Sequence, residues 1–360
     1  MPKKIMVLQA YSAHNRGDGL LVDETIALLR HVFGRDVQIE MCASDPQSFE
    51  YLGIRVYRSK PTMFGWSRAY VKKLFRLHEF DLIVGVGGGY LRAGHPVEFL
   101  KCLLVMVPQL LAAGMSSTPS VYLPQSIGPF RCGTRYLFRS LVRRISCFML
   151  RDDRSMGESA LENCQRFPDL ALTSPEFRES LQHEDSIDVD QGVVLTARAV
   201  HGSLPKGVKQ FSELLSEREI PLVGYIQSSV GGNNDTEVQQ QLTGLNNISP
   251  AEFLRHNNCP PRVVVAVRLH AALMALKAGH FVIHLAYERK GFSAFADAGL
   301  QDWVHNVNTF DPHAVIMQVE SLLFDAVTRT EYRQAVQRQL PLLEAKYVEM
   351  AEVLQASVNN

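Results

Sequence analysis

Positively charged side chains follow two successive apolar runs in the second half of the chain, each where a helix should begin. Arg268-Leu269-His270 comes directly after the apolar run 263–267, and Lys290 follows the next apolar run. Burying an arginine at such a place is costly unless an anion or a carboxylate pairs with it. The spacing therefore predicts a site for a compact, strongly negative ligand, and structural ion pairing with protein carboxylates is the alternative.

A third cation, Arg151, stands in the same position in the first half of the chain, after the apolar run 147–150. A guanidinium group suits a carboxylate or a phosphate, because its planar N–H donors match two oxygens at once. We therefore include Arg151 among the predicted anion ligands.

Three glycine-containing motifs follow apolar runs in the first half, at residues 15–19, 85–90 and 124–129. They lack the GxGxxG spacing of a dinucleotide site and the Lys-Ser/Thr pair of a P-loop, so they do not predict a nucleotide site. Their polar side chains and exposed amides suit a ligand, which for the 124–129 motif could be a sugar hydroxyl, and the alternative is that they form only turns, corners and helix caps. The residues concerned are Asn15, Asp18, Gly88 and Gln125.

Short apolar runs alternate with longer helical patterns along the whole chain, which predicts parallel sheets wrapped by helices. The strands expected are 4–9, 37–42, 82–86, 120–123 and 147–150 in the first half, and 192–196, 221–226, 262–267 and 281–286 in the second. A polar, acidic stretch at 173–191 predicts the domain boundary, and 330–356 predicts one long helix that caps the second domain or returns to the first. The fold class expected is therefore α/β, with two Rossmann-like doubly wound domains facing a cleft.

Composition and charge exclude several classes of protein. Lysine plus arginine equals aspartate plus glutamate at 37 each, so no global field favours nucleic acid, and nucleic acid is not an expected partner. The six cysteines lack the spacing of a disulfide framework, which favours a reducing cytoplasm. The most apolar stretch, 99–115, contains a lysine and is shorter than the roughly 20 residues a bilayer requires, so we expect a buried helix.

Histidine and arginine patterns support weaker hypotheses. The twelve histidines show no HExxH motif, and no CxxC motif occurs, so we expect neither a metal nor another cofactor. Arg135, Arg139 and Arg143 recur every fourth residue and predict a basic helical stripe, which is usually only a solvated face. The alternative is a peripheral contact with the inner face of the cytoplasmic membrane, where the stripe would meet a lipid-linked acceptor.

Taken together, NRGD, GVGGG, PQSIGPF, LRDDRS, RLHAALMALKAG and AYERKGFSAFADAGL resemble the polysaccharide pyruvyl transferase family, in the same order and over about residues 9–300. The resemblance implies a glycosyltransferase-B-like fold, phosphoenolpyruvate as the donor, and a product in which pyruvate is joined to a sugar as a ketal. It implies an acceptor-side domain at 1–180, a donor-side domain at 181–328 and a C-terminal helix at 329–360. The acceptor is then a sugar of an exopolysaccharide or another cell-surface glycan, free or lipid-linked.

The resemblance also implies roles for individual residues. The donor ligands that it implies are Arg151, Arg268, Leu269, His270 and Lys290. The acceptor ligands that we expect from the motifs themselves are Asn15, Asp18, Gly88 and Gln125. His270 is the candidate acid because histidine changes protonation near neutral pH, and Asp18 is the candidate group to orient or deprotonate a sugar hydroxyl. Some relatives carry glutamate where this chain has Gly19, so the catalytic base stays open. Two alternatives are a nucleotide-sugar glycosyltransferase of the same architecture and a non-catalytic carbohydrate-binding relative.

Overall fold

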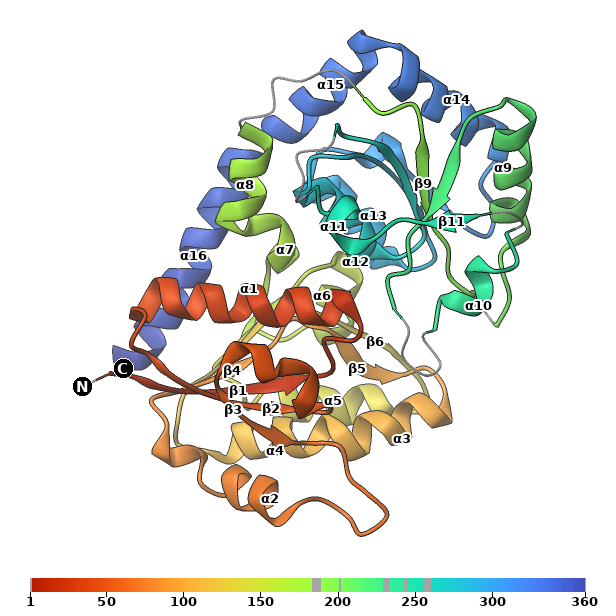
Figure 1. Ribbon diagram of the computed structural model, residues 1–360. Helices are drawn as coiled ribbons and strands as arrows, with labels where there is room; N and C mark the ends of the chain where they lie inside the picture. The colour runs from red at the N-terminus through yellow and green to blue at the C-terminus, as the bar shows by residue number, and fades with distance from the viewer. Residues whose placement is uncertain are drawn as a thin grey trace. The chain divides into compact units, whose positions relative to one another are not determined.

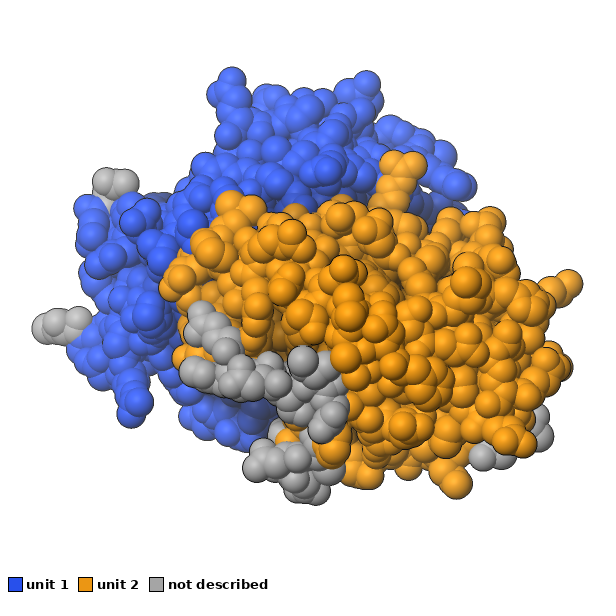
Figure 2. Space-filling model, turned by 90° about the horizontal axis from the view of Figure 1, so that it is seen from above, with its two compact units in different colours: residues 1–14, 18–170, 345–360 blue, residues 15–17, 171–344 orange. Residues whose placement is uncertain are grey.

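The computed structural model describes residues 2–182, 189–200, 202–228, 234–242, 245–255 and 260–359. The chain divides into two compact units, coloured in Figure 2. The first unit contains residues 1–14, 18–170 and 345–360, and the second contains 15–17 and 171–344. The predicted domains divide after residue 180, whereas the units divide after Leu170.

The first unit is built on a parallel sheet with the strand order β3-β2-β1-β4-β6-β7-β8, and β5 pairs with β6 outside that order. Its strands are β1 (Lys4–Ala10), β2 (Gln38–Ala43), β3 (Arg55–Arg58), β4 (Leu82–Gly85), β5 (Gly88–Ala93), β6 (Ser120–Phe130), β7 (Cys147–Leu150) and β8 (Cys164–Arg166). Its helices are α1 (Arg16–Phe33), α2 (Arg68–Leu74), α3 (Pro96–Val105), α4 (Val107–Met115), α5 (Thr134–Val142), α6 (Asp153–Ser159) and the last part of α16 (Leu340–Asn359), with short 3-10 helices at Pro46–Leu52 and Leu77–Glu79.

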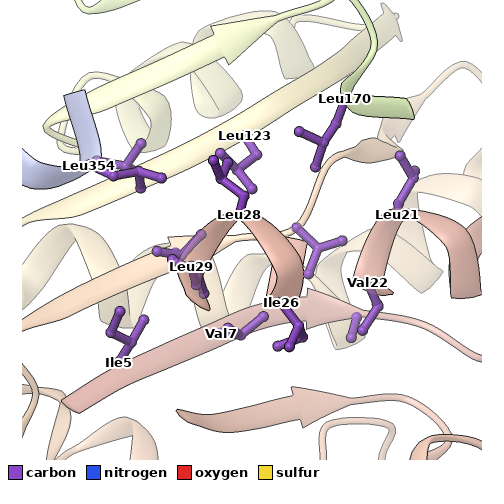
Figure 3. Close-up of a cluster of buried hydrophobic side chains, with 14 of the residues drawn as sticks. Ile5, Val7, Leu21, Val22, Ile26, Leu28, Leu29, Leu123, Leu170 and Leu354 are labelled. Carbon is purple, nitrogen blue, oxygen red and sulfur yellow. The ribbon is translucent and has the colours of Figure 1, made fainter. Parts of the chain in front are cut away.

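Alternate residues of the central strands pack on opposite faces of this sheet, because successive side chains of a strand point to opposite sides. Ile5 and Val7 of β1 belong to a core with α1 and α16, which Figure 3 shows from within. Met6 and Leu8 belong to a second core with α2, α3, α4 and α5. The first unit is therefore a three-layer structure, with helices on both faces of the sheet (Figure 1).

The second unit repeats this plan with the strand order β11-β10-β9-β12-β13-β14, again parallel throughout. Its strands are β9 (Val193–Thr196), β10 (Leu222–Gly224), β11 (Asn246–Asn247), β12 (Val263–Ala266), β13 (Phe281–Ala286) and β14 (Val304–Asn306). Its helices are α7 (Leu170–Thr173), α8 (Pro175–Gln182), α9 (Lys206–Glu217), α10 (Thr236–Gln239), α11 (Pro250–Phe253), α12 (Leu269–Lys277), α13 (Arg289–Asp297), α14 (Pro312–Phe324) and α15 (Ala326–Gln337), with a 3-10 helix at Gln301–Trp303.

The predicted α/β fold is confirmed, and several predicted elements were wrong in detail. The segment 124–129, expected to be a loop, lies within the long strand β6, and the glycine segment leads into strand β5 instead of a helix. The tail is two helices, α15 and α16, instead of one. Tyr347, Met350 and Leu354 of α16 pack into the core of the first unit, so the tail returns to that unit. Residues 183–188 of the predicted boundary lie outside the described residues.

No single helix in the described part of the chain is both long and apolar enough to cross a bilayer. Among the described residues, only the bent pair α3 and α4 is long and apolar enough when its two helices are taken together. The stretch 99–115, expected to be one buried helix, is this pair, and it leaves Leu100 and Met115 exposed.

Candidate functional site

The strand order places a ligand crevice at a defined edge of the second sheet. β9 and β12 are neighbours, and the order of strands reverses between them. In doubly wound sheets, ligands bind outside the carboxyl ends of the strands at this reversal. The residues that follow β9, β12 and β13 are therefore the candidates for ligand binding in the second unit.

Arg268 follows β12 and is buried, with 7% of its surface exposed. Its Nε donates to Asp235 Oδ2 and its Nη2 donates to Asp235 Oδ1, both at 2.6 Å, which is a bidentate ion pair. Burial raises the pKa of Asp235, and the Arg268 guanidinium opposes that rise. Asp235 also accepts a hydrogen bond from the backbone N–H of Ser228 at 3.2 Å, so the carboxylate holds both the arginine and the loop after β10.

Arg198 follows β9 and contacts Tyr287, which follows β13. Its Nη1 donates to the Tyr287 hydroxyl, and its guanidinium carbon lies 4.7 Å from the centre of the tyrosine ring. The hydrogen bond and the cation–π contact together fix the guanidinium above the ring. A second arginine therefore lies at the carboxyl ends of the same sheet.

Lys290 lies in the first turn of α13 and pairs with Glu288, whose Oε2 is 2.8 Å from the lysine Nζ. Beneath this turn, His284 of β13 is buried, and one of its ring nitrogens lies 2.7 Å from the Ala266 carbonyl oxygen. Burial, with a smaller contribution from Lys290, lowers the pKa of His284 to about 4. His284 is therefore neutral near pH 7 and supports the turn.

His270 lies in the first turn of α12, is partly exposed, and packs against Gly17, in the first turn of α1. A Cβ added to Gly17 would fall 2.5 Å from His270 Nδ1, so only glycine fits there without displacing the imidazole. Asn15, directly before α1, forms an antiparallel bridge with Ser228 and accepts a hydrogen bond from the Gly17 N–H at 3.3 Å. The second unit thus gathers Asn15, Arg268 and His270 around the Ser228 loop.

Arg151 follows β7 in the first unit and is almost completely buried. It forms an ion pair with Asp169, and its Nε donates to Ser126 Oγ at 3.0 Å. Both partners of the ion pair expose at most 2% of their side chains. The buried pair fixes the carboxyl end of β7 to the segment that follows β8.

Asp18 lies in the first turn of α1 and accepts a hydrogen bond from the Tyr90 hydroxyl. Burial and the nearby Asp18 raise the pKa of Tyr90 well above its usual value, so the phenol stays protonated and donates. Tyr90 also stacks on Tyr11, with ring centres 5.9 Å apart. A Cβ on Gly88 would fall 2.5 Å from the Tyr90 ring, so this glycine makes room for the tyrosine that holds Asp18.

Gln125 has an internal role in the first unit. It is fully buried, and its Nε2 donates to Gln9 Oε1 at 3.2 Å and to the Val86 carbonyl at 2.8 Å. These bonds tie β6 to the ends of β1 and β4. The alternative that Gln125 supports the protein's own loops therefore fits the structure better than a contact between its side chain and a sugar.

The predicted cations are distributed over both units, and each is paired with a carboxylate. Arg151 belongs to the first unit, whereas Arg268 and Lys290 follow neighbouring strands of the second. Their partners are Asp169, Asp235 and Glu288. Structural ion pairing, given above as the alternative, is what the structure contains, so these buried charges do not by themselves require an anionic ligand.

Sequence reasoning missed Arg198, Asp169 and Asp235, and it assigned no role to Tyr287 of the YERK motif. Arg198 comes two residues after a predicted strand, so the rule that selected Arg268 would also have found it. Asp169 and Asp235 carry no such signal, because each meets its arginine only through the fold.

The basic stripe on α5 is largely engaged with the protein itself. Arg135 donates to the carbonyls of Gly157 and Glu158, and Arg139 donates to that of Ala160. These bonds hold α5 to α6 and favour a structural role for the stripe over a membrane contact. In the described ranges, no group of three or more His, Cys, Asp or Glu side chains is arranged to hold a metal ion.

Solved structures with a similar fold share little sequence with this chain. MnaA of S. aureus, solved with UDP, aligns with a TM-score of 0.57 at 12% identity, over 99% of this chain and 97% of that one. UDP-GlcNAc 2-epimerase from Neisseria meningitidis, bound to UDP-GlcNAc, gives 0.56 at 12% identity over 98% and 100% of the two chains. MurG from Acinetobacter baumannii gives 0.53 at 14% identity over 99% and 100%. These likenesses establish a glycosyltransferase-B type of fold.

A family model provides the match by sequence. The model named polysaccharide pyruvyl transferase matches residues 15–289, a range that contains every predicted site residue except Lys290. No significant sequence match to a curated protein accompanies it. Because the matched range covers well over half of the chain, the protein belongs to the polysaccharide pyruvyl transferase family.

Proposed function

We propose that this protein transfers pyruvate from phosphoenolpyruvate to two hydroxyls of a glycan sugar, forming a ketal and releasing phosphate. The family match over residues 15–289 carries the proposal, since it names this class of transfer. The cationic edge of the second sheet supports it, because phosphoenolpyruvate places a phosphate and a carboxylate on three carbons.

Donor binding is assigned to the residues that follow β9, β12 and β13. Arg198, Arg268 and Lys290 lie at this edge of the sheet, together with the carboxylates Asp235 and Glu288. The first turns of α12 and α13 add backbone N–H donors and the positive end of each helix dipole. The phosphate of the donor binds these cations either together with the carboxylates or in place of the carboxylates.

The chemistry assigned to His270 is proton delivery to the methylene carbon of the donor. One sugar hydroxyl then bonds to the adjacent carbon, and the second hydroxyl replaces the phosphate at that carbon. The two hydroxyls lose two protons in total: one balances the proton that the methylene carbon gained, and the other leaves with the phosphate. Asp18 orients or deprotonates an acceptor hydroxyl, and Asn15 is a further acceptor ligand. We expect no metal and no other cofactor in this reaction.

The test is phosphate release from phosphoenolpyruvate, measured with galactose, glucose, glucuronate and mannosamine acceptors, free and lipid-linked. We expect release with at least one acceptor, and His270→Ala should abolish it while the melting temperature stays near that of the wild type. Normal transfer by His270→Ala would remove this residue from the mechanism. If none of the acceptors on the panel supported phosphate release, the assignment of phosphoenolpyruvate as the donor would be contradicted.

A nucleotide-sugar glycosyltransferase is the second candidate, because two of the similar structures were solved with UDP or UDP-GlcNAc. Thermal-shift measurements separate the two functions, since a ligand stabilises the folded protein that binds it. Stabilisation by phosphoenolpyruvate and not by uridine or guanosine diphosphate sugars is expected. The reverse pattern would favour the second candidate, and a non-catalytic relative would release no phosphate from any donor and acceptor pair.

A further inference from the structure

Positive charge is concentrated in one part of the first unit, although the chain as a whole is neutral. Residues 51–151 contain fifteen lysines and arginines but only three acidic residues. Between Tyr51 and His78 there is no acidic residue at all. Such asymmetry within a neutral chain indicates a partner that is itself negatively charged.

A tight turn in this basic segment carries two exposed apolar side chains. The backbone N–H groups of Thr62 and Gly65 each donate to the other's carbonyl, at 2.9 and 3.1 Å, which closes the turn around Met63 and Phe64. Both of these side chains are 98% exposed. Apolar side chains exposed to water at the tip of a turn are unfavourable in free energy, and their insertion into an apolar medium would remove that cost.

An apolar groove adjoins this turn. Trp66 donates its indole N–H to the Leu104 carbonyl at 3.1 Å, which ties the turn to the end of α3. The groove lies between α2 and α4, has a volume of about 620 Å³, and is lined mainly by apolar side chains that include Trp66, Phe75, Leu111 and Met115. Phe75 and Met115 are 81% and 69% exposed, so the apolar surface continues beyond the groove.

Basic side chains come just before and after the 62–66 turn in the sequence. Arg58, Lys60, Arg68 and Lys72 are exposed and form no ion pair with any residue that the structure describes. They differ in this from Lys73 and Arg76 of the same segment, which pair with Glu40 and Glu79. Exposed cations on and next to the elements that carry an apolar surface match the two layers of a membrane face, anionic headgroups and acyl chains.

We propose that the first unit docks on anionic phospholipid bilayers through the surface formed by the 62–66 turn, α2 and α4. Met63 and Phe64 enter the headgroup and acyl boundary, and Arg58, Lys60, Arg68 and Lys72 contact lipid phosphates. The proposal does not depend on the donor or on the reaction. It differs from the α5 stripe considered from the sequence, in which Arg135 and Arg139 are bonded to carbonyls of α6 and its C-terminal end.

Flotation of the full-length protein with vesicles tests the proposal. We expect the wild type to bind phosphatidylcholine vesicles that contain phosphatidylglycerol, to bind pure phosphatidylcholine much less, and to dissociate as salt is raised. The double variant Met63→Ser/Phe64→Ser should lower the partition coefficient by about tenfold or more. The double variant Lys60→Glu/Arg68→Glu should lower the partition coefficient by at least about tenfold. Each basic side chain near an anionic surface raises membrane affinity by a factor on the order of ten or slightly less, and this variant reverses two of them.

Matched variants in other places control for charge and apolar content. Met317→Ser/Phe324→Ser changes an exposed pair of the same residue types on α14, 66% and 63% exposed, and Arg35→Glu/Lys209→Glu reverses two exposed cations elsewhere. Both should bind as the wild type does. Absence of wild-type binding, or equal loss in test and control variants, would overturn the proposal. It would also be overturned if Met63→Ser/Phe64→Ser dissociated an oligomer in sedimentation without changing vesicle binding, since the surface would then be a subunit interface.

Discussion

The backbone of Gly17 lies against the imidazole of His270, so closely that a Cβ at residue 17 would fall 2.5 Å from Nδ1 and 2.6 Å from the histidine Cβ. The contact joins the first turn of α1 to the first turn of α12. It fixes the position of the only histidine among the predicted site residues. The absence of a side chain at residue 17 therefore allows the His270 imidazole its present position.

Gly17→Ala should reduce activity more than it reduces stability. The added methyl group must displace the His270 ring, and a displacement of about 1 Å at a reacting group can lower kcat/KM by about 100-fold. Overpacking of this kind costs roughly 1–3 kcal/mol in the free energy of unfolding. Steady-state phosphate release and urea denaturation measure the two effects.

Gly157→Ala is the matched control for this glycine, because a Cβ there meets no atom within 4 Å and the residue is helical. It should retain full activity and equal or greater stability. If Gly17→Ala kept wild-type kcat/KM, the placement of His270 by the glycine turn would have no role in the reaction.

The positions of Arg268 and Lys290 could be predicted from the sequence because they depend on one strong local signal. β12 is a continuous apolar run, β13 is apolar except for His284, and every residue of both is buried. The carboxyl ends of parallel neighbours meet at one edge of a sheet, so the residues that follow them must lie there. The same rule applied to β9 leads to Arg198.

The partners of these cations could not be predicted, because they arrive through tertiary structure. Asp235 precedes the short helix α10, and no periodic pattern connects it with Arg268. The strand at 124–129 was missed for a related reason. Its Pro and Gly residues are typical of loops, and only pairing with β5 and β7 makes the segment part of a strand.

Asp235→Asn should destabilise the second unit strongly. The change removes the charge that balances Arg268 and leaves a buried guanidinium without its carboxylate, and breaking a buried pair in this way costs about 3–5 kcal/mol. Urea denaturation should show the loss as a lower midpoint.

An exposed ion pair provides the control for Asp235. Glu213→Gln removes the partner of Lys209 on α9, where both side chains are more than half exposed, and it should change the free energy of unfolding by less than about 1 kcal/mol. Similar losses for the two variants would mean that burial of the Arg268 pair has no energetic consequence.

Glu288→Gln and Lys290→Met should shift the donor affinity in opposite directions. If phosphoenolpyruvate competes with Glu288 for Lys290, neutralising the carboxylate lowers the KM for the donor several-fold, and removing the lysine raises it. A purely structural pair predicts instead that both variants lose stability and that neither changes the KM.

Lys209→Met, which removes an exposed lysine on α9, should leave the KM unchanged. Titration of each variant with phosphoenolpyruvate in a thermal-shift experiment ranks the variants by their affinity for the donor, independently of turnover. A KM that rises in both Glu288→Gln and Lys290→Met would contradict the competition between donor and carboxylate.

Two buried histidines should make the protein sensitive to mild acid. Burial lowers the pKa of His284 to about 4 and that of His280 to about 3, from an ordinary value of 6.5. His280 Nδ1 accepts a hydrogen bond from the Arg262 N–H at 2.9 Å, which a protonated ring could not accept. Below about pH 6.5 the unfolded chain binds protons at these two residues that the folded protein does not. Stability is therefore fully present above the unfolded pKa and falls as the pH drops toward 4.

Urea denaturation between pH 7.5 and pH 4.5 measures this loss. Each histidine should add a slope that approaches about 1.4 kcal/mol per pH unit in the free energy of unfolding. His284→Asn should remove the contribution of one proton to the slope, whatever its effect on the free energy of unfolding at pH 7. His313→Gln, at an exposed position in the first turn of α14, should leave the slope unchanged. If His284→Asn left the slope unchanged, His284 would take up no extra proton on unfolding, and the prediction would be wrong.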